Sequence, residues 1–319
     1  MLYSIFLIIV GFILLMFGAE YMVKGAVAIA SKLNIPTIIV GLTIVAFGTS
    51  TPEFVVSIKS ALNGSAGLSI GNVVGSNIAN ILLILGLTAI ISPIKCRRRI
   101  FLRDYKFLFI ASLMFSLFAL TGNFVRWHGI TFLVLLVYFV YYNYQNSKKD
   151  SISEDEVSPL VDKSWLYVTS LTIGGLLGII YGADILILGA VKMARILGVS
   201  EEIIGVTIIA VGTSLPELAT TLLATVRGQA GVALGNVVGS NIWNIVFIIG
   251  ATSTITDVNI PKQFLIYDIW MMVLATLILY PAMMSKARLT RKEGGLFLIV
   301  YIFYIATQIL ISRGVLSII

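Results

Sequence analysis

The sequence has little of the chemistry on which many soluble enzymes and metalloproteins depend. Its 319 residues include one cysteine, Cys96, and one histidine, His128. A single cysteine excludes an internal disulfide and any cysteine-based metal cluster. The histidine has no HExxH context and lies far from any Gly-x-Ser-x-Gly segment, so no credible set of hydrolase residues is present and an enzyme is not expected.

Charge is also scarce. Asp, Glu, Lys and Arg make up 12% of the chain and hydrophobic residues 58%, with a mean hydropathy of +1.01. This is more apolar surface than a soluble domain can bury, so the sequence predicts an integral protein of the lipid bilayer. The net charge of +7 is then loop charge that sets orientation and not a nucleic-acid surface.

Ten apolar segments follow one another with short polar gaps. Each has about 20 residues or more, the length that crosses roughly 30 Å of hydrocarbon as a helix. Because the segments are continuous and do not alternate apolar with polar residues, they indicate helices and not barrel strands. The fold predicted is an all-α polytopic membrane protein with helices over 2–31, 36–62, 67–93, 104–122, 127–145, 166–196, 201–227, 231–256, 263–283 and 293–312.

One stretch occurs twice. Residues 41–86 and 205–250 match without a gap at an offset of 164 residues, and residues 18–34 match 182–198 at the same offset. The first helix is therefore a retained helix and not a signal peptide. Since each half holds five helices, an odd number, the second copy enters the membrane from the opposite face. The sequence predicts two inverted repeats, 1–146 and 164–319, joined by a polar linker at 147–163, an architecture typical of secondary transporters.

The basic residues predict the orientation. Lys and Arg are concentrated in the loops that follow odd-numbered helices, including the cluster Arg97, Arg98 and Arg99 and the central linker. Cytoplasmic loops carry such an excess. We expect a multi-pass protein of the cell (plasma) membrane with both termini outside and the linker in the cytoplasm.

Each copy of the repeat places a carboxylate deep in the membrane. Glu53 lies about 11 residues before a turn near Gly64, and Glu217 lies equally far before a turn near Gly228, which puts each roughly 17 Å down, near the bilayer midplane. A charge there costs about 3 kcal/mol or more and normally faces an interior cavity. Structure alone does not need such an acid in both halves, so the pair indicates function.

The residues around the two glutamates supply further oxygens. Pro52 and Pro216 disturb the helical turn before them, and Gly75 and Gly239 are expected to break helices 3 and 8. Helices 2, 3, 7 and 8 are therefore predicted to be broken. The candidate oxygens are carbonyls around Ala46, Thr49, Ala210 and Thr213, and the hydroxyl and amide groups of Ser76, Asn77, Asn80, Ser240, Asn241 and Asn244.

This set contains carboxylates, hydroxyls, amides and carbonyls, with no sulfur or imidazole. Such oxygens suit Ca²⁺ or Na⁺ and not copper or zinc. Ions that need the same oxygens compete, and competition at one central site is the physical basis of exchange. We expect transported Na⁺ and Ca²⁺, no cofactor, and no obligatory protein partner.

At these motifs, Gly48-Thr49-Ser50-x-Pro52-Glu53 and Gly71-Asn72-x-x-Gly75-Ser76-Asn77 with their second copies, the chain resembles the cation/Ca²⁺ exchanger superfamily, in particular its sodium/calcium exchanger branch and the small prokaryotic members. The resemblance covers nearly the whole chain. It implies exchange of Na⁺ for Ca²⁺, usually three to one, with helices 1 and 6 sliding to alternate access. By position it implies Glu53 and Glu217 as ligands shared by Ca²⁺ and Na⁺, completed by Ala46, Thr49, Ser50, Ser76, Ala210, Thr213, Ser214 and Ser240.

Two alternatives stay open. Proton/calcium exchangers of the same superfamily carry an additional Glu after the Gly-Asn pair, where this chain has Val in both copies. Position 244 is Asn, as in potassium-independent animal exchangers, where some archaeal and the potassium-dependent ones carry Asp. A passive cation channel would use the same oxygens in a continuous pore, but inverted repeats with broken helices favour a transporter.

Overall fold

The structure is a computed structural model that describes residues 1–147, 158–197 and 212–312. These residues are mostly helical and form two compact units, each with residues from both halves of the chain. Unit 1 comprises 1–52 and 145–236, and unit 2 comprises 53–144 and 237–319. The two units do not correspond to the predicted halves, 1–146 and 164–319, which stay a prediction. Most of the expected linker, and the start of the expected helix 201–227, lie outside the described residues.

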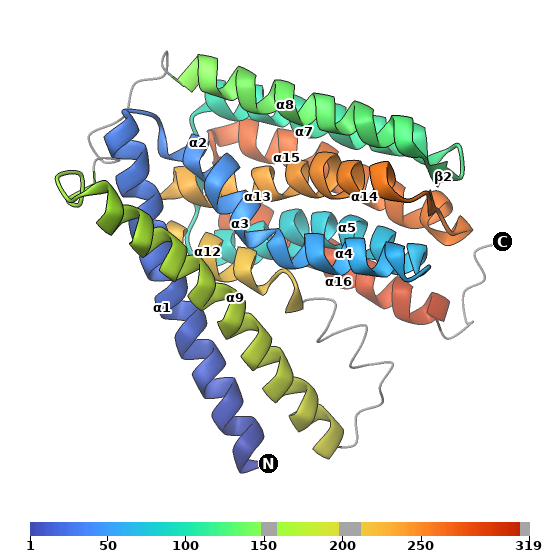
Figure 1. The fold of residues 1–319 in the computed structure, drawn as a ribbon, viewed down its shortest axis with the longest axis horizontal. Coiled ribbons are helices and arrows are strands. Elements are labelled where there is room, and N and C mark those ends of the chain that lie inside the picture. Colours follow the sequence, from blue (N-terminus) through green and yellow to red (C-terminus); the bar gives the residue numbers. More distant parts are fainter. Residues whose placement is uncertain (148–157, 198–211, 313–319) are drawn as a thin grey trace. The chain divides into compact units, whose positions relative to one another are not determined.

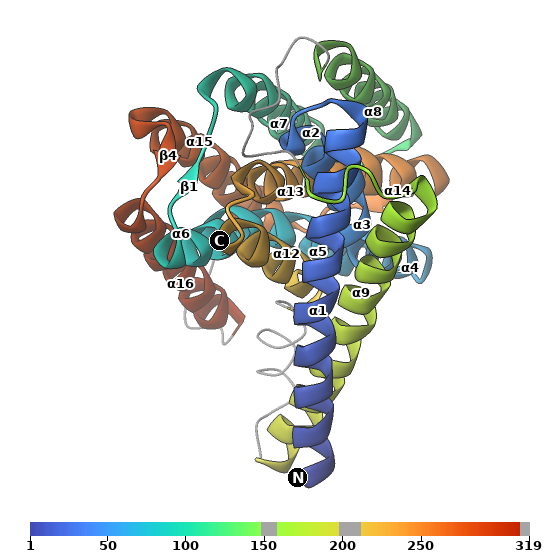
Figure 2. The same cartoon turned by 90° about the vertical axis from the view of Figure 1, so that its left-hand side faces the viewer.

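Unit 1 is organised around two long helices, α1 (Leu2–Leu33) and α9 (Trp165–Ile196). They run side by side in opposite directions in both views (Figures 1 and 2). Its buried apolar cluster includes Leu15, Met22 and Ile179. The remaining elements of the unit are α2 (Thr37–Val40), the π-helix η1 (Gly41–Val45), α3 (Ala46–Thr49), α12 (Leu215–Val226) and the start of α13 (Ala230–Trp243).

Glycines bring α1 and α9 together. On α1 they recur every seven residues at Gly11, Gly18 and Gly25, and on α9 at Gly175, Gly182 and Gly189. A Cβ on Gly11 would lie 2.5 Å from the backbone nitrogen of Leu186, and one on Gly18 would lie 2.6 Å from that of Ile179. Small residues in membrane helices permit such close approach of two backbones.

Unit 2 contains the remaining helical segments. These are α4 (Thr51–Leu62, from Glu53 on), α5 (Ala66–Ala79), η2 (Asn80–Leu85), α6 (Gly86–Ile91), α7 (Arg98–Ala119), α8 (Arg126–Ser147), the end of α13, η5 (Asn244–Ile249), α14 (Gly250–Ile255), η6 (Phe264–Asp268), α15 (Ile269–Lys286) and α16 (Arg291–Ser312). Buried phenylalanines fill its core, including Phe101, Phe115, Phe124 and Phe132. Helices α6 and α16 come close at Gly86 and Gly294.

Two pairs of very short strands link distant parts of unit 2. β1 (Ile94–Lys95) pairs antiparallel with β4 (Arg288–Leu289), and β2 (Asn123–Phe124) pairs with β3 (Val258–Asn259). β1 and β4 lie side by side in Figure 2. After β1, the Cys96 amide donates to Ala287 O at 2.9 Å. Burial raises the pKa of the Cys96 thiol to about 11.

The membrane prediction is confirmed at the level of apolar helices. Among the described residues, six helices are long and apolar enough to cross a membrane, or seven if Thr37–Thr49 and Thr51–Leu62 form one broken span. Ser50 interrupts that span, one residue before the turn that holds Pro52. The six are Leu2–Leu33, Ala66–Ile91, Trp165–Ile196, Ala230–Ile255, Phe264–Lys286 and Arg291–Ile311.

The expected breaks at Gly75 and Gly239 are wrong. Helices α5 and α13 continue through both glycines, because a single glycine only weakens a helix, by about 1 kcal/mol. The irregularity falls later, where Asn80 and Asn244 each begin a π-helical segment. Extra residues of this kind release a backbone turn without ending the helix and occur often at functional sites.

Candidate ion-binding site

The first glutamate, in unit 2, is held through its backbone. Glu53 lies in the first turn of α4 and is fully buried. Gly64, with φ of 77°, makes the tight turn that leads from α4 into α5. This turn lays α5 back along α4, so that Asn72 Nδ2 donates to Glu53 O at 3.0 Å and to Ser57 Oγ at 2.8 Å. One amide thus ties the glutamate turn to the next helix.

The second glutamate, in unit 1, is held by the same device. Glu217 lies in the first turn of α12, is fully buried, and is followed by a turn at Gly228 with φ of 76°. Asn236 Nδ2 donates to Glu217 O at 3.3 Å and to Thr221 Oγ1 at 2.9 Å. In both copies the asparagine follows its glutamate by 19 residues. The predicted turns at Gly64 and Gly228 are therefore confirmed, and each positions a buried carboxylate.

Residues of the first motif reach the second glutamate within unit 1. Ser50 Oγ donates to Glu217 Oε1 at 3.2 Å. Thr49 Oγ1 donates to Asn236 Oδ1 at 3.0 Å and lies 3.3 Å from Ala46 O. All of these polar groups are buried. A carboxylate, two hydroxyls, an amide and a carbonyl from the two halves of the sequence therefore lie together in this unit.

Four asparagines cross in unit 2. Asn80 Nδ2 donates to Asn241 Oδ1 at 3.0 Å, and Asn244 Nδ2 donates to Asn77 Oδ1 at 3.1 Å. Asn77 and Asn241 each donate to the other's backbone carbonyl, at 3.3 and 3.4 Å. Because their amide nitrogens are occupied, Asn80 and Asn244 present their Oδ1 atoms elsewhere, and both of these buried oxygens have no hydrogen-bond partner. Two amide oxygens in matching places are thereby left for a cation or water.

The predicted site residues fall into the two units. Ser76 and Ser240 are buried in unit 2, and Ser214, which precedes α12, is buried in unit 1. Thr213 is half-buried in unit 1, and Ala210 lies outside the described residues. In each unit the predicted site residues contribute buried oxygen atoms, which lie around a carboxylate or a cluster of amides. Hard cations prefer oxygen ligands of this kind.

The roles of Asn72 and Asn236 were not predicted from the sequence. Both residues belong to the Gly-Asn pair of the repeated motif. Their identity at the 164-residue offset, in a membrane helix where an amide is costly without partners, was the available signal. The hydrogen-bond partners of these asparagines could not be predicted, since one partner in each case is the backbone carbonyl of the glutamate, on the other helix of the hairpin.

Known proteins of similar sequence identify the family to which a chain with this site belongs. The family model for "Sodium/calcium exchanger protein" matches residues 3–145 and 167–310. The chain belongs to the sodium/calcium exchanger family. It is similar to a putative antiporter, CaxA, of Alkalimonas amylolytica, with 36% identity over 95% of this chain and 98% of the relative. It is also similar to the sodium/calcium exchanger MaX1 of Methanosarcina acetivorans, with 29% identity over 94% of this chain and 96% of the relative.

The fold agrees with this family. The sodium-calcium exchanger NCX_Mj, in crystals soaked with zero Na⁺ and Ca²⁺, matches with a TM-score of 0.84 and 32% identity over 96% of this chain and 99% of the solved chain. The family consists of exchangers and not of enzymes. The resemblance noted from the motifs is therefore confirmed, and the chain is a multi-pass membrane protein of cation/Ca²⁺ exchange.

Proposed function

We propose that this chain is a secondary active antiporter that exchanges Na⁺ for Ca²⁺ by alternating access at a central two-glutamate site. The observation that carries the proposal is the duplicated brace, in which Asn72 and Asn236 hold the backbones of two fully buried glutamates at the same 19-residue separation. A buried acid in a membrane helix is costly. Two of them, braced alike, are accounted for by a function that uses both.

The proposed ligands are the predicted residues. Glu53 and Glu217 carry the charge shared by Ca²⁺ and Na⁺, and neutral oxygens complete the shells. Two carboxylates neutralise one Ca²⁺ or attract two or more Na⁺, which is the basis of competition. The neutral ligands proposed are Ala46, Thr49, Ser50, Ser76, Asn80, Ala210, Thr213, Ser214, Ser240 and Asn244.

The proposed architecture is two inverted five-helix repeats, ten helices in all, in the cell membrane. Elements that match at the 164-residue offset support it, such as α1 with α9 and η2 with η5. The loop between α6 and α7 carries Arg97, and the expected linker carries Lys148, Lys149 and Lys163. By the positive-inside rule these loops face the cytoplasm and both termini face outside.

Flux in proteoliposomes tests the proposal. Vesicles loaded with Na⁺ should take up ⁴⁵Ca²⁺ when diluted into Na⁺-free buffer, and vesicles without a Na⁺ gradient should not. A proton gradient in place of Na⁺ is the second arm, and uptake driven by protons alone would contradict the proposal. Uptake at the rates of single-channel conduction would contradict a carrier.

The same vesicles test electrogenicity. If three Na⁺ leave as one Ca²⁺ enters, each cycle moves one positive charge out, and 100 mV biases it by about 2.3 kcal/mol. An inside-positive potential set with K⁺ and valinomycin should therefore speed Ca²⁺ uptake. Uptake that is indifferent to the potential would show electroneutral exchange.

A further inference from the structure

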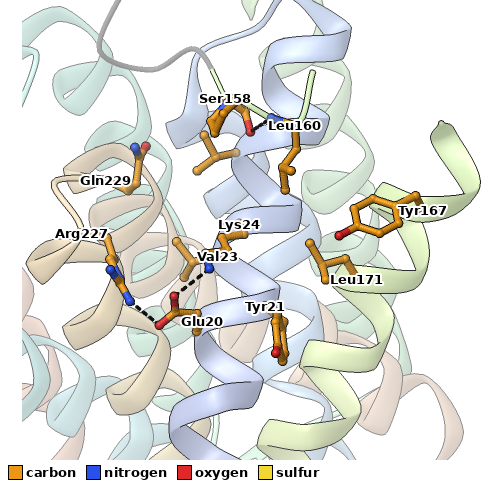
Figure 3. A pocket seen from close by; sticks show the side chains of 12 residues that line it. Glu20, Tyr21, Val23, Lys24, Ser158, Leu160, Tyr167, Leu171, Arg227 and Gln229 are labelled. Carbon is orange, nitrogen blue, oxygen red and sulfur yellow. Dashed lines mark hydrogen bonds and ion pairs between the residues drawn. The ribbon is translucent and has the colours of Figure 1, made fainter. Parts of the chain in front are cut away.

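A cavity of about 530 Å³ lies in unit 1, and its lining includes none of the residues of the glutamate motifs (Figure 3). One wall is formed by α1 between Glu20 and Val27, and another by the start of α9, with Tyr167 and Leu171. The segment around Ser158 and Leu160 covers it, and the turn between α12 and α13 completes it with Arg227. Its walls combine an apolar lining with a charged corner.

The charged corner has one more cation than anion. Glu20 accepts from Lys24 Nζ at 2.8 Å and from Arg227 Nη2 at 2.5 Å. The two cationic side chains are 51% and 54% exposed, whereas Glu20 is 21% exposed. An ammonium has three donors and a guanidinium has five, so both cations keep donors for a second anion. The corner therefore complements a group with one negative charge and several acceptor oxygens.

The surroundings place the cavity at a membrane interface. Lys32, near the end of α1, lies over the ring of Trp165 at 5.4 Å, and Tyr167 follows within the first turn of α9. Tryptophan, tyrosine and basic residues gather at the level of lipid headgroups. The apolar wall, which includes Val23, Val27 and Leu171, continues from this level along α1 and α9.

We propose that this cavity binds an anionic glycerophospholipid, with its phosphodiester against Lys24 and Arg227. The first part of an acyl chain then lies along Val27 and Leu171. The cavity is too small for a whole phospholipid, so the rest of the acyl chains extends into the bilayer. Glu20 bridges the two cations and competes with the phosphate for them.

Lipid binding to the full-length protein tests the proposal. Purified protein in neutral detergent is titrated with phosphatidylglycerol, phosphatidylcholine or soluble glycerol phosphate, and binding is read by native mass spectrometry and by the unfolding temperature. Phosphatidylglycerol should bind and stabilise the protein, and the other two should not. Equal effects of phosphatidylcholine, or of glycerol phosphate, would overturn a site for an anionic lipid.

Variants separate this site from general lipid attraction. Lys24→Gln and Arg227→Gln should each weaken phosphatidylglycerol binding roughly fivefold, since a basic residue near the surface contributes about 1 kcal/mol. Lys192→Gln is the matched control, because Lys192 lies over Tyr3 at the other end of the same helix pair, and it should leave binding unchanged. An equal loss in the control would overturn the proposal.

Glu20→Gln gives the sharpest result. It removes the competing carboxylate and leaves both cations, so phosphatidylglycerol should bind more tightly although an ion pair is lost. A corner that serves only as a structural ion pair predicts lower stability and no tighter binding, and that outcome would overturn the proposal. Leu171→Trp, which fills the apolar part without touching a charge, should exclude the lipid.

Discussion

The two glutamate turns form a pair in which the backbone is held alike and the surroundings differ. Asn72 and Asn236 make the same two donations at the same separation, but the side-chain acceptor is Ser57 in one copy and Thr221 in the other. The peptide that carries the charge is thus positioned alike in both copies, with either a serine or a threonine as the second acceptor.

The largest effect is expected from the charges themselves. Glu53→Gln and Glu217→Gln each remove half of the negative charge and should lower Na⁺-driven Ca²⁺ uptake in proteoliposomes roughly 100-fold or more, the equivalent of about 3 kcal/mol. Asp162→Asn removes an exposed acid outside the proposed site and serves as the control. Wild-type uptake by either of the first two variants would show that the glutamates do not act as a pair.

A smaller effect is expected from the braces. Asn72→Ala and Asn236→Ala remove the donors to buried carbonyls, which costs about 1 to 3 kcal/mol of unfolding free energy each, and the displaced glutamate should lower uptake about tenfold. The unfolding temperature and the Ca²⁺ dependence of uptake measure the two effects. Ser57→Ala and Thr221→Val leave the donation to the glutamate carbonyl and should retain most activity; an equal loss would place the role in the side-chain acceptor.

The hydrogen-bonded asparagines of unit 2 allow a third comparison. They are Asn77, Asn80, Asn241 and Asn244. In Asn244→Asp the donor to Asn77 Oδ1 is replaced by an oxygen, and the proposed site, with its two glutamates, gains a third carboxylate. Uptake should persist but become more sensitive to acid, or acquire a requirement for K⁺, and Asn80→Asp should act in the same direction. The wild type needs no K⁺ on this argument. Na⁺-driven uptake measured with and without K⁺ checks it, and a wild type that stops when K⁺ is withdrawn contradicts it.

The two strand pairs allow a test of the inverted topology by thiol labelling, and this test is expected to change transport least. Cys96 and Ile260 lie at the 164-residue offset, and their amides make matching bonds, to Ala287 O and Gly122 O. If the halves are inverted, a membrane-impermeant maleimide should label Ile260→Cys in Cys96→Ser from outside and Cys96 only from the cytoplasm. Labelling of both from one side would contradict inversion.

The rate of Cys96 labelling has its own pH dependence. Since burial raises the thiol pKa to about 11, the thiolate is a minor species at neutral pH, and the thiolate is the nucleophile. The labelling rate should therefore rise about tenfold for each pH unit below about 11 and level off above it. A rate that levels off near pH 9, as for an exposed thiol, would contradict this burial.

Much of the fold was predictable because the repeat doubles every signal. Gly64 and Gly228 marked the turns, and Pro52 marked the interruption at Ser50, since each residue restricts its own backbone. The helix that begins at Arg98 was predicted to begin at 104, because its first turn and a half holds Arg99 and Arg103 and reads as loop by hydropathy. The π-helical segments were not predictable, since an extra residue in a wholly apolar helix leaves its pattern unchanged.

The site was predictable in composition and less so in its connections. Glu53 and Glu217 stood out because charge is rare in such segments, and the crossing of Asn77 with Asn241 was beyond the sequence because it joins residues 164 apart. The brace by Asn72 depends on the rotation of α5 about its axis, which a glycine turn alone does not fix. Polar residues whose burial in a membrane helix is costly indicate a site, and the packing of their helices determines which of their atoms come into contact.

The glycine rows of α1 and α9 leave the alignment of these helices ambiguous. Both rows repeat every seven residues, so moving one helix along the other by about 10.5 Å would again bring glycine against glycine. The rows therefore set how closely the helices approach, but not which of several equivalent alignments is adopted. The ends make that choice, because Lys32 meets Trp165 at one end and Lys192 meets Tyr3 at the other, and a shift of one repeat would separate both pairs.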